Sequence, residues 1–186
     1  MAPWLSRWAI DPGPLEGWIA GMRLLELPRD DILVHAGDSS RHIYLVQSGL
    51  LRLYYTDDDG RERNKAFYGA GAITGPVSAI ISGHAASFSI QALEACELLQ
   101  ADLEQLMQIA PSHPDVSRLV ITLLSEAFMR NEQREKLLLT CNAEQRYRWL
   151  LDHQADLVER IPQYHIAAYL GVDAVSLSRL KRKLDQ

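Results

Sequence analysis

The residues best suited to chemistry lie close to the end of the chain. Four cations stand together in Arg179-Leu180-Lys181-Arg182-Lys183, directly after two serines. Guanidinium and ammonium groups bind phosphate, and a guanidinium can also donate two hydrogen bonds to the O6 and N7 atoms of guanine. This group of residues therefore suits DNA, although a short run of charges is also typical of a solvated helix end.

The charge of the chain is unevenly distributed. The whole chain carries a formal charge of −5, which taken alone argues against nucleic-acid binding. Residues 1–141 hold 12 Lys+Arg against 18 Asp+Glu (−6), whereas residues 142–186 hold 7 against 6 (+1). Because phosphate attraction acts over about a Debye length of ~10 Å, an acidic body with a basic tip remains compatible with DNA binding.

The segment that must position these cations meets the constraints of a helix-turn-helix. Pro162 is expected at the first position of its first helix. Ala167 is small enough for the two helices to cross, and Gly171 accepts the left-handed backbone that the turn requires. Asp173 is expected to cap the second helix, and a helical hairpin without DNA-binding function is the alternative. The apolar residues expected to seal both helices are Ile166, Leu170, Val172, Leu177, Leu180 and Leu184.

The period of the second helix predicts which of its residues would reach DNA. Arg179 is the leading candidate for a bidentate contact to guanine. The others expected at the DNA are Ala174, Val175, Ser176, Ser178, Lys181, Arg182 and Lys183. Ala174 and Val175 could contact thymine methyl groups, and the serines and lysines could contact phosphates. On the first helix Tyr164 and His165 could meet the DNA backbone, while packing or solvent exposure fits them equally well.

A long helix is expected upstream of this unit. Apolar residues from Val116 to Leu139 recur at spacings of three or four without glycine or proline, which predicts a helix of about 25 residues and roughly 37 Å. Its wide apolar stripe suits packing on its own domain and pairing with a second copy, so we expect a homodimer. A helix that only covers its own domain is the alternative. Asn142 and Gln145 form a capping-box pattern that begins the next helix.

From residue 32 to residue 102 the chain is typical of strands joined by tight turns. Asp57-Asp58-Asp59-Gly60 predicts a hairpin turn between strands at Leu50–Thr56 and Arg61–Tyr68. The fold class expected is therefore α+β. Residues 1–114 would form a β-roll with an N-terminal helical segment, residues 115–140 a dimerisation helix, and residues 141–186 a helix-turn-helix domain.

Several other functions lack support in the sequence. No P-loop, GxSxG or HExxH motif is present, so an enzyme is not expected, and no cofactor is expected either. Cys96 and Cys141 lack the spacing of metal ligands. No apolar run approaches the ~18 residues of a membrane span, and residues 1–10 lack a signal-peptide core, so we expect a cytoplasmic protein without a membrane partner.

Taken together, these blocks resemble the Crp/Fnr superfamily of regulators, over about Leu27 to Leu184. The matching blocks are the glycine framework Ala36–Gly49, the long helix Asp115–Leu139, the helix start Asn142–Leu151 and the DNA-reading unit at 159–184. The resemblance implies a cyclic-nucleotide-binding-like β-roll and a homodimeric transcription regulator. Its partner would be double-stranded DNA with a pseudo-palindromic operator, and RNA polymerase enters consideration as a second partner.

The effector pocket departs from the family's cyclic-nucleotide binders. Those proteins use a Gly-Glu pair for the ribose and a later Arg-Ser or Arg-Thr pair for the phosphate. The matching stretches here are Gly75-Pro76-Val77-Ser78 and Ala86-Ser87, so Pro76 replaces the Glu and Ala86 replaces the Arg. Because a buried charge-assisted hydrogen bond contributes ~1.5–3 kcal/mol, we expect cyclic AMP to bind weakly or not at all.

Other effectors stay open. Asn131 and Glu132 fall where the family's dimer helix borders the pocket, so they could receive a different polar effector, and a roll without any effector is the simplest alternative. Nothing in the sequence places a surrogate cation there from Arg41, Arg52 or Arg63. An iron–sulfur sensor needs about four cysteines, and only two are present. Haem ligation by His35, His42 or His84 is less expected than ordinary surface or packing roles for these histidines.

The DNA-reading end also departs from the family. Ala174-Val175 stands where the best-known members present Arg-Glu, so their half-site cannot be transferred. The sequence ends two residues after Leu184, without the family's β-hairpin wing, and weaker phosphate anchoring is expected. The alternative function is therefore a module that senses a small molecule or a partner and has weak or lost DNA binding.

Overall fold

Two antiparallel sheets form a β-roll in the first half of the protein. The computed structural model describes residues 11–184. One sheet has the order β1-β8-β3-β6 and the other has the order β2-β7-β4-β5. The strands are β1 Arg23–Leu27, β2 Ile32–Val34, β3 His42–Ser48, β4 Leu50–Thr56, β5 Glu62–Gly69, β6 Ile73–Thr74, β7 Ser89–Ala92 and β8 Cys96–Asp102.

Helices flank the roll and form the second half of the protein. Two 3₁₀ helices, η2 Gly13–Leu15 and η3 Ala110–Ser112, join the α-helices to the rest of the chain. The α-helices are α1 Glu16–Ala20, α2 Val77–Ser82, α3 Leu103–Ile109, α4 Pro114–Thr140, α5 Ala143–Val158, α6 Gln163–Leu170 and α7 Ala174–Leu184. The expected α+β class, with a roll followed by helices, is confirmed. Residues 1–10 and 185–186, which belong to the first and last expected domains, lie outside the described residues.

The β4–β5 hairpin forms where its turn residues predict it. Gly60 has a φ of +77°, which suits glycine. The carboxylate of Asp57 accepts a hydrogen bond from the amide of Arg61 at 2.8 Å. The strand after the turn begins at Glu62, one residue later than expected, because Arg61 still belongs to the turn.

Alternating side chains of the two sheets fill the interior of the roll. The largest fully buried ones include Leu51, Leu53, Ile90 and Leu98. All four belong to one apolar cluster that also holds aromatic residues of β3, β5 and the loop before β7. Burial of this kind is the main source of stability for a sheet pair.

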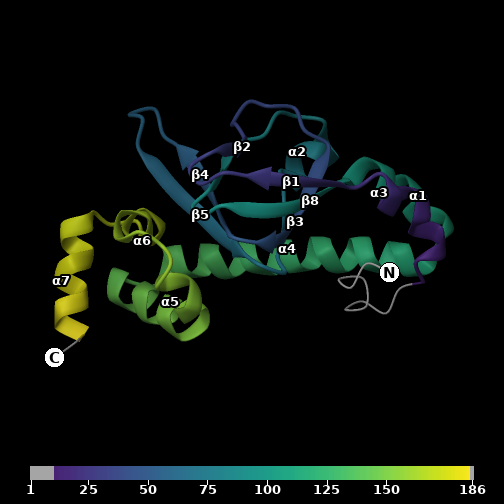
Figure 1. Cartoon of the computed structure of the whole chain (residues 1–186). Helices are drawn as coiled ribbons and strands as arrows, with labels where there is room; N and C mark the ends of the chain where they lie inside the picture. Colours follow the sequence, from purple (N-terminus) through teal and green to yellow (C-terminus); the bar gives the residue numbers. More distant parts are fainter. Residues whose placement is uncertain (1–10, 185–186) are drawn as a thin grey trace.

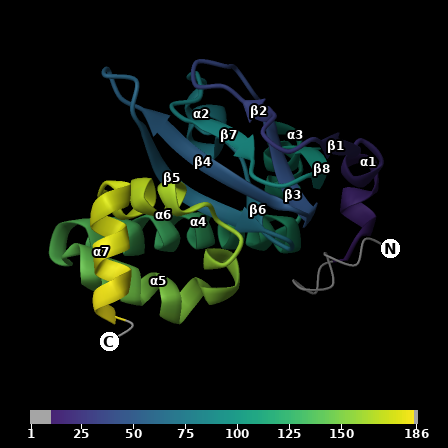
Figure 2. The ribbon, with the colours of Figure 1, turned by 60° about the vertical axis from the view of Figure 1, so that its left-hand side comes forward.

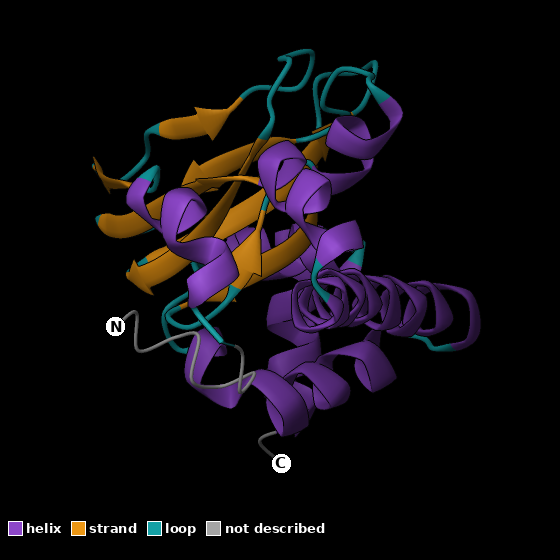
Figure 3. Cartoon of the chain, turned by 90° about the vertical axis from the view of Figure 1, so that its right-hand side faces the viewer, coloured by secondary structure: helices purple, strands orange, loops and turns teal. Residues whose placement is uncertain are grey.

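The long helix α4 runs beneath the whole roll (Figure 1). At ~1.5 Å per residue its 27 residues span about 40 Å, slightly more than expected. Val116 and Leu119 are buried in a cluster with Ile43, Leu103 and Leu106 of the roll and α3. Viewed almost along its axis, α4 lies between the orange sheets above and α5 and α7 below (Figure 3).

The last three helices share a core with the roll. Leu50, Phe67 and Leu93 of the roll lie in the same buried cluster as Leu150 of α5 and Ile166 of α6. In Figure 2, α6 lies against β5, and Figure 1 shows α7 at the end of the protein opposite α1. None of the helices within residues 11–184 combines the length and apolar composition that crossing a membrane requires.

Candidate nucleic-acid interface and internal cavity

The turn between α6 and α7 has the geometry that the sequence predicts. Gly171 is left-handed, with a φ of +73°. The Asp173 carboxylate accepts hydrogen bonds from the amide of Ser176 at 2.7 Å and from its hydroxyl at 3.0 Å, which caps α7. Leu177 is only 1% exposed and anchors the helix. Pro162, expected as the first helical residue, lies instead at the N-cap of α6 with a ψ of 139°, and the helix begins at Gln163.

The outer face of α7 carries most of the residues predicted to reach DNA. Arg179 is exposed and lies one turn from the exposed Val175, whose side chain is 60% accessible. The other exposed residues of the predicted set are Ala174, Ser178, Arg182 and Lys183, and Ser176 and Lys181 are half-buried. The hydroxyl of Ser176 is engaged in the cap and Lys181 donates to Gln163 at 3.2 Å.

Lys183 has a partner within the protein. Its ammonium lies 2.8 Å from the carboxylate of Glu144, which also pairs with Arg148 at 3.0 Å. Both cations hold the pKa of the Glu144 carboxyl below its ordinary value. This pairing fixes the end of α7 to the start of α5, where the expected capping box of Asn142 and Gln145 is present.

The two residues predicted on α6 have opposite environments. Tyr164 is 61% exposed and remains available to a phosphate. His165 is 5% exposed, so the expectation that it meets the DNA backbone is corrected: its ring faces the roll. The reason is that α6 packs on β5, and this packing directs position 165 inward and position 164 outward.

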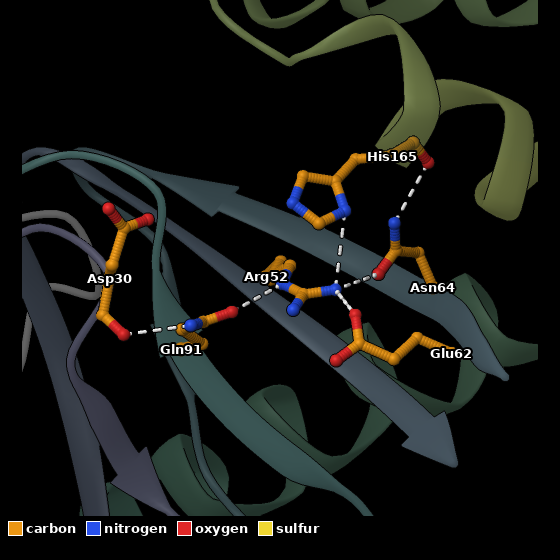
Figure 4. A network of polar contacts seen from close by, with 6 residues as sticks. All are labelled: Asp30, Arg52, Glu62, Asn64, Gln91 and His165. Atoms are coloured by element: carbon orange, nitrogen blue, oxygen red, sulfur yellow. Dashed lines mark hydrogen bonds and ion pairs between the residues drawn. The ribbon is translucent and has the colours of Figure 1, made fainter. Parts of the chain in front are cut away.

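A buried arginine joins the roll to α6 (Figure 4). Arg52 of β4 is 4% exposed and donates to Glu62 at 2.5 Å and to Gln91 at 2.8 Å. Its Nη1 also lies 3.2 Å from Nδ1 of His165 and 3.2 Å from Oδ1 of Asn64. Asn64 in turn donates to the backbone carbonyl of His165 at 2.8 Å. No sequence pattern predicts this network, because its members are 10 to 113 positions from Arg52.

Burial and the neighbouring cation change the titration of His165. Desolvation is the larger cause and the charge of Arg52 the second, and together they lower the pKa of His165 from 6.5 to about 4. The ring is therefore neutral near pH 7, and Nδ1 can accept a hydrogen bond from Arg52.

Two more arginines cross the same contact. Arg134 of α4 donates to the backbone carbonyl of Tyr169 in α6, and its guanidinium lies 3.8 Å from the centre of the Tyr169 ring. Arg160 donates to Glu94 of the roll and, at 3.0 Å, to the carbonyl of Gly49. The helix-turn-helix unit is thus held on the roll by polar contacts around an apolar core.

A cavity of about 300 Å³ lies between the roll and α4. Four residues of the predicted effector pocket line it, namely Gly75, Val77, Ser78 and Asn131. The other four, Pro76, Ala86, Ser87 and Glu132, are not among its lining residues. Pro76 caps α2 and is buried, as is Ala86, whereas Ser87 and Glu132 face solvent. Pro76 and Ala86, which stand at the ribose-binding and phosphate-binding positions of the cyclic-nucleotide binders, therefore do not line this cavity.

The cavity contains cations that the sequence did not indicate. Lys65 of β5 and Arg130 of α4 line it, together with the buried hydroxyl of Thr74. The three arginines considered as surrogates lie elsewhere: Arg41 pairs with Asp102, Arg52 with Glu62 and Arg63 with Asp57. Alternation of side chains along β5 could have predicted that Lys65 and Asn64 face opposite sides of the sheet. Only the packing of α4 on the roll brings Arg130 to the same cavity as Lys65.

Within residues 11–184 no three histidine, cysteine or carboxylate side chains are grouped in a way that could hold a metal ion. Cys96 is buried, and burial raises the pKa of its thiol. His42 is half-buried, and burial lowers its pKa.

Large apolar side chains are exposed along one side of α4. Ile121 is 63% exposed, Phe128 is 67% exposed and Leu139 is 76% exposed. The first two are seven residues apart, and the first and third are 18 apart, which is about five helical turns at ~3.6 residues per turn. All three therefore lie on one line along the helix.

Comparison with known sequences gives the family context. Residues 24–113 match the cyclic nucleotide-binding domain family. The fumarate and nitrate reduction regulatory proteins of Salmonella typhimurium and Escherichia coli are 30% identical over 120 residues, or 64% of this chain. The match covers 47% of each relative, so the chain spans about half the length of the curated relatives it matches.

Solved structures show the same fold over most of the chain. FixK2 from Bradyrhizobium japonicum has a TM-score of 0.77 and 20% identity, and covers 88% of this chain and 84% of its own. CLP, the c-di-GMP responsive global regulator of Xanthomonas campestris, has a TM-score of 0.75 and 21% identity over 94% of this chain and 92% of its own. A Crp/Fnr-family structure from Eubacterium rectale has a TM-score of 0.76 and 17% identity over 98% and 86%. The sequence matches and the shared fold make the chain similar to regulators of the Crp/Fnr type, with a cyclic nucleotide-binding domain over residues 24–113.

Proposed function

We propose that this protein is a homodimeric transcription regulator that binds double-stranded DNA in a sequence-specific manner. The observation that carries the proposal is the outer face of α7, which presents Arg179 beside Val175 on a capped helix anchored by the buried Leu177. A helix presented in this way fits the major groove, and an exposed guanidinium there can read guanine. The names of the relatives, which describe regulatory proteins, agree with this function.

The exposed apolar line of α4 supports a dimer. Ile121, Phe128 and Leu139 would be buried if two α4 helices packed side by side, and large exposed apolar side chains aligned on one helix are typical of interaction sites. A two-fold dimer would present two α7 helices to one face of DNA, which requires a pseudo-palindromic operator. RNA polymerase would then be the partner of the DNA-bound dimer.

We further infer that cyclic AMP is not the signal. Pro76 and Ala86 stand where the family's nucleotide binders have their Glu and Arg, and neither lines the cavity. A cyclic phosphate would lose both of those polar contacts. Isothermal titration with cyclic AMP should show no binding in the micromolar range, and micromolar affinity would contradict this inference.

Selection of DNA from a random pool tests the main function. The purified chain should enrich an inverted repeat whose half-sites are about one helical turn apart, ~10 base pairs. Arg179→Ala should change the enriched sequence. Arg118→Ala, at the far end of α4, is the matched control and should leave the enriched sequence unchanged. A pool without enriched sequences would reject sequence-specific binding.

The second candidate is a sensing module with weak or lost DNA affinity. Two observations favour it: the cavity between the roll and α4, and the polar contacts that hold α6 on the roll. A module of this kind would bind a small molecule and yield no enriched repeat in the same selection, which separates the two functions.

A further inference from the structure

We propose that the cavity between the roll and α4 binds a small amphipathic organic acid, with one carboxylate and an apolar body. The inference deepens the proposed function, since such an acid would be the regulator's signal. The cavity measures about 300 Å³, at the lower end of the range for small-molecule sites. It is bordered by the roll on one side and by α4 on the other, so a ligand there would contact both.

The charges around the cavity favour a monoanion. Its charged lining residues are Lys65 of β5, Arg130 of α4 and Glu126 of α4. Their formal charges sum to +1, so one negative charge on a ligand would neutralise the site. A zwitterion would leave the excess positive charge in place, and a dianion would reverse its sign.

The two cations are already oriented by aromatic rings. Nζ of Lys65 lies 5.3 Å from the centre of the Phe88 ring and 3.2 Å from the hydroxyl of Tyr55. The Arg130 guanidinium lies 4.6 Å from the centre of the Tyr68 ring. A carboxylate would offer charge-assisted hydrogen bonds, which are stronger than these ring contacts.

A buried hydroxyl gives independent evidence for a polar occupant. Thr74 is 5% exposed and lines the cavity, and its Oγ1 has no hydrogen-bond partner among the described residues. Buried hydroxyls are nearly always hydrogen-bonded, so an unpartnered one at a cavity wall points to a ligand or a water that completes it. A carboxylate oxygen could accept this hydrogen bond.

The rest of the wall suits hydrocarbon. Leu53, Val77, Phe88, Leu124 and Phe128 line the cavity from β4, α2, the loop before β7 and α4. An apolar chain or ring packed on these side chains would be removed from water, which favours binding.

Calorimetric titration of the full chain without DNA tests the proposal. The probes are octanoate and 4-phenylbutyrate, each compared with its neutral amide, and cyclic AMP. We expect at least one acid to bind about tenfold or more tightly than its amide and than cyclic AMP, since one charge-assisted contact is worth about that factor. Comparison of octanoate with 4-phenylbutyrate shows whether the cavity prefers an alkyl chain or an aromatic ring as the apolar part of the ligand.

Three variants locate the site. Lys65→Gln and Arg130→Gln should each weaken binding of the acid about fivefold or more, while Arg118→Gln, an exposed cation on the same helix, should leave it unchanged. Thr74→Val should weaken binding without lowering the melting temperature, because it removes an unpartnered buried hydroxyl.

Several results would overturn the proposal: no probe binding at millimolar concentration, equal affinity of acid and amide, tighter binding of octylammonium than of octanoate, or equal losses in Arg118→Gln and Arg130→Gln. None of these outcomes bears on DNA selection. Failure of the ligand site and failure of the DNA-binding function are therefore separable.

Discussion

Nη1 of Arg52 lies 3.2 Å from Nδ1 of His165, and this pair joins β4 of the roll to α6 of the helix-turn-helix unit. Arg52 must be the donor and the neutral His165 ring the acceptor, because the pKa of His165 is lowered to about 4. The contact therefore couples the position of α6 to the protonation state of one ring.

Removal of the arginine should destabilise the protein. In Arg52→Met, the side-chain amide oxygen Oδ1 of Asn64 and the ring of His165 would lose a buried donor. Breaking a buried polar network of this kind costs ~3 kcal/mol in free energy of unfolding, measured by urea denaturation. Arg52→Lys keeps the charge but lacks the planar guanidinium, so its free energy of unfolding should lie between those of Arg52→Met and the natural protein. Equal stability of Arg52→Met and the natural protein would contradict the structural role of Arg52.

Acid should weaken the same contact. A histidine whose pKa is lower in the folded state stabilises the fold fully above its unfolded value of 6.5, and this contribution is lost as the pH falls from 6.5 toward about 4. The total is ~3 kcal/mol, since one pKa unit corresponds to about 1.4 kcal/mol. Urea denaturation at pH 7 and pH 5 should therefore show a loss of about 2 kcal/mol.

The control for this pH effect is His165→Asn, whose amide oxygen can accept the hydrogen bond from Arg52 but does not titrate. His42, whose pKa is also lowered by burial, contributes in the same direction, so both proteins should carry His42→Gln. An identical loss of stability with and without His165 would show that another group is responsible.

The turn of the helix-turn-helix should tolerate only residues that accept a left-handed backbone. Gly171→Ala should lower the free energy of unfolding by ~1 kcal/mol, because φ is +73° and an added Cβ disfavours that conformation. The strain would be conformational, since the nearest atom to that Cβ is 3.6 Å away at the end of the Arg146 side chain. Gly171→Asn should cost less, and an Ala variant as stable as glycine would argue against strain at this turn.

The outer face of α7 should contain residues that set the DNA sequence preference and residues that bind any DNA sequence equally. Arg179→Ala should weaken binding to the selected operator by ~1–3 kcal/mol and relax the preference at one base pair. Arg182→Ala should weaken binding to all sequences about equally if it contacts phosphate. Titrations of operator and scrambled DNA at fixed salt measure both effects, and an unchanged base preference in Arg179→Ala would remove its assigned role.

The exposed line of α4 should control the oligomeric state. The double variant Ile121→Asp, Phe128→Asp should sediment as a monomer, because two carboxylates on each helix would be buried against each other in a dimer. Gln108→Asp adds a carboxylate at an exposed position of α3 and should leave the dimer intact. A dimer that survives the double variant must use another surface.

Local signals in the sequence determined the strands, the β4–β5 turn, the long helix, the capping box at Asn142 and the Gly171 turn with its Asp173 cap. Each of these features depends on residues within a few positions of one another. The residue types favour a local backbone geometry, and that geometry sets the local hydrogen bonds. The outward face of α7 followed from the helical period and one anchoring leucine. The roles of these surfaces in DNA binding and pairing remain proposals.

Only the tertiary structure decided what lies at the contacts between distant segments. The position of His165 could not be foreseen, because helical period alone cannot tell which of two adjacent residues will meet the roll. The cations of the cavity come from β5 and α4, and packing of these elements brings Lys65 and Arg130 to one wall although 65 positions separate them. The sequence specifies the chemical type of each side chain, whereas burial and charge pairing arise from long-range packing. Here that packing set the environment of His165 and the charge of the cavity.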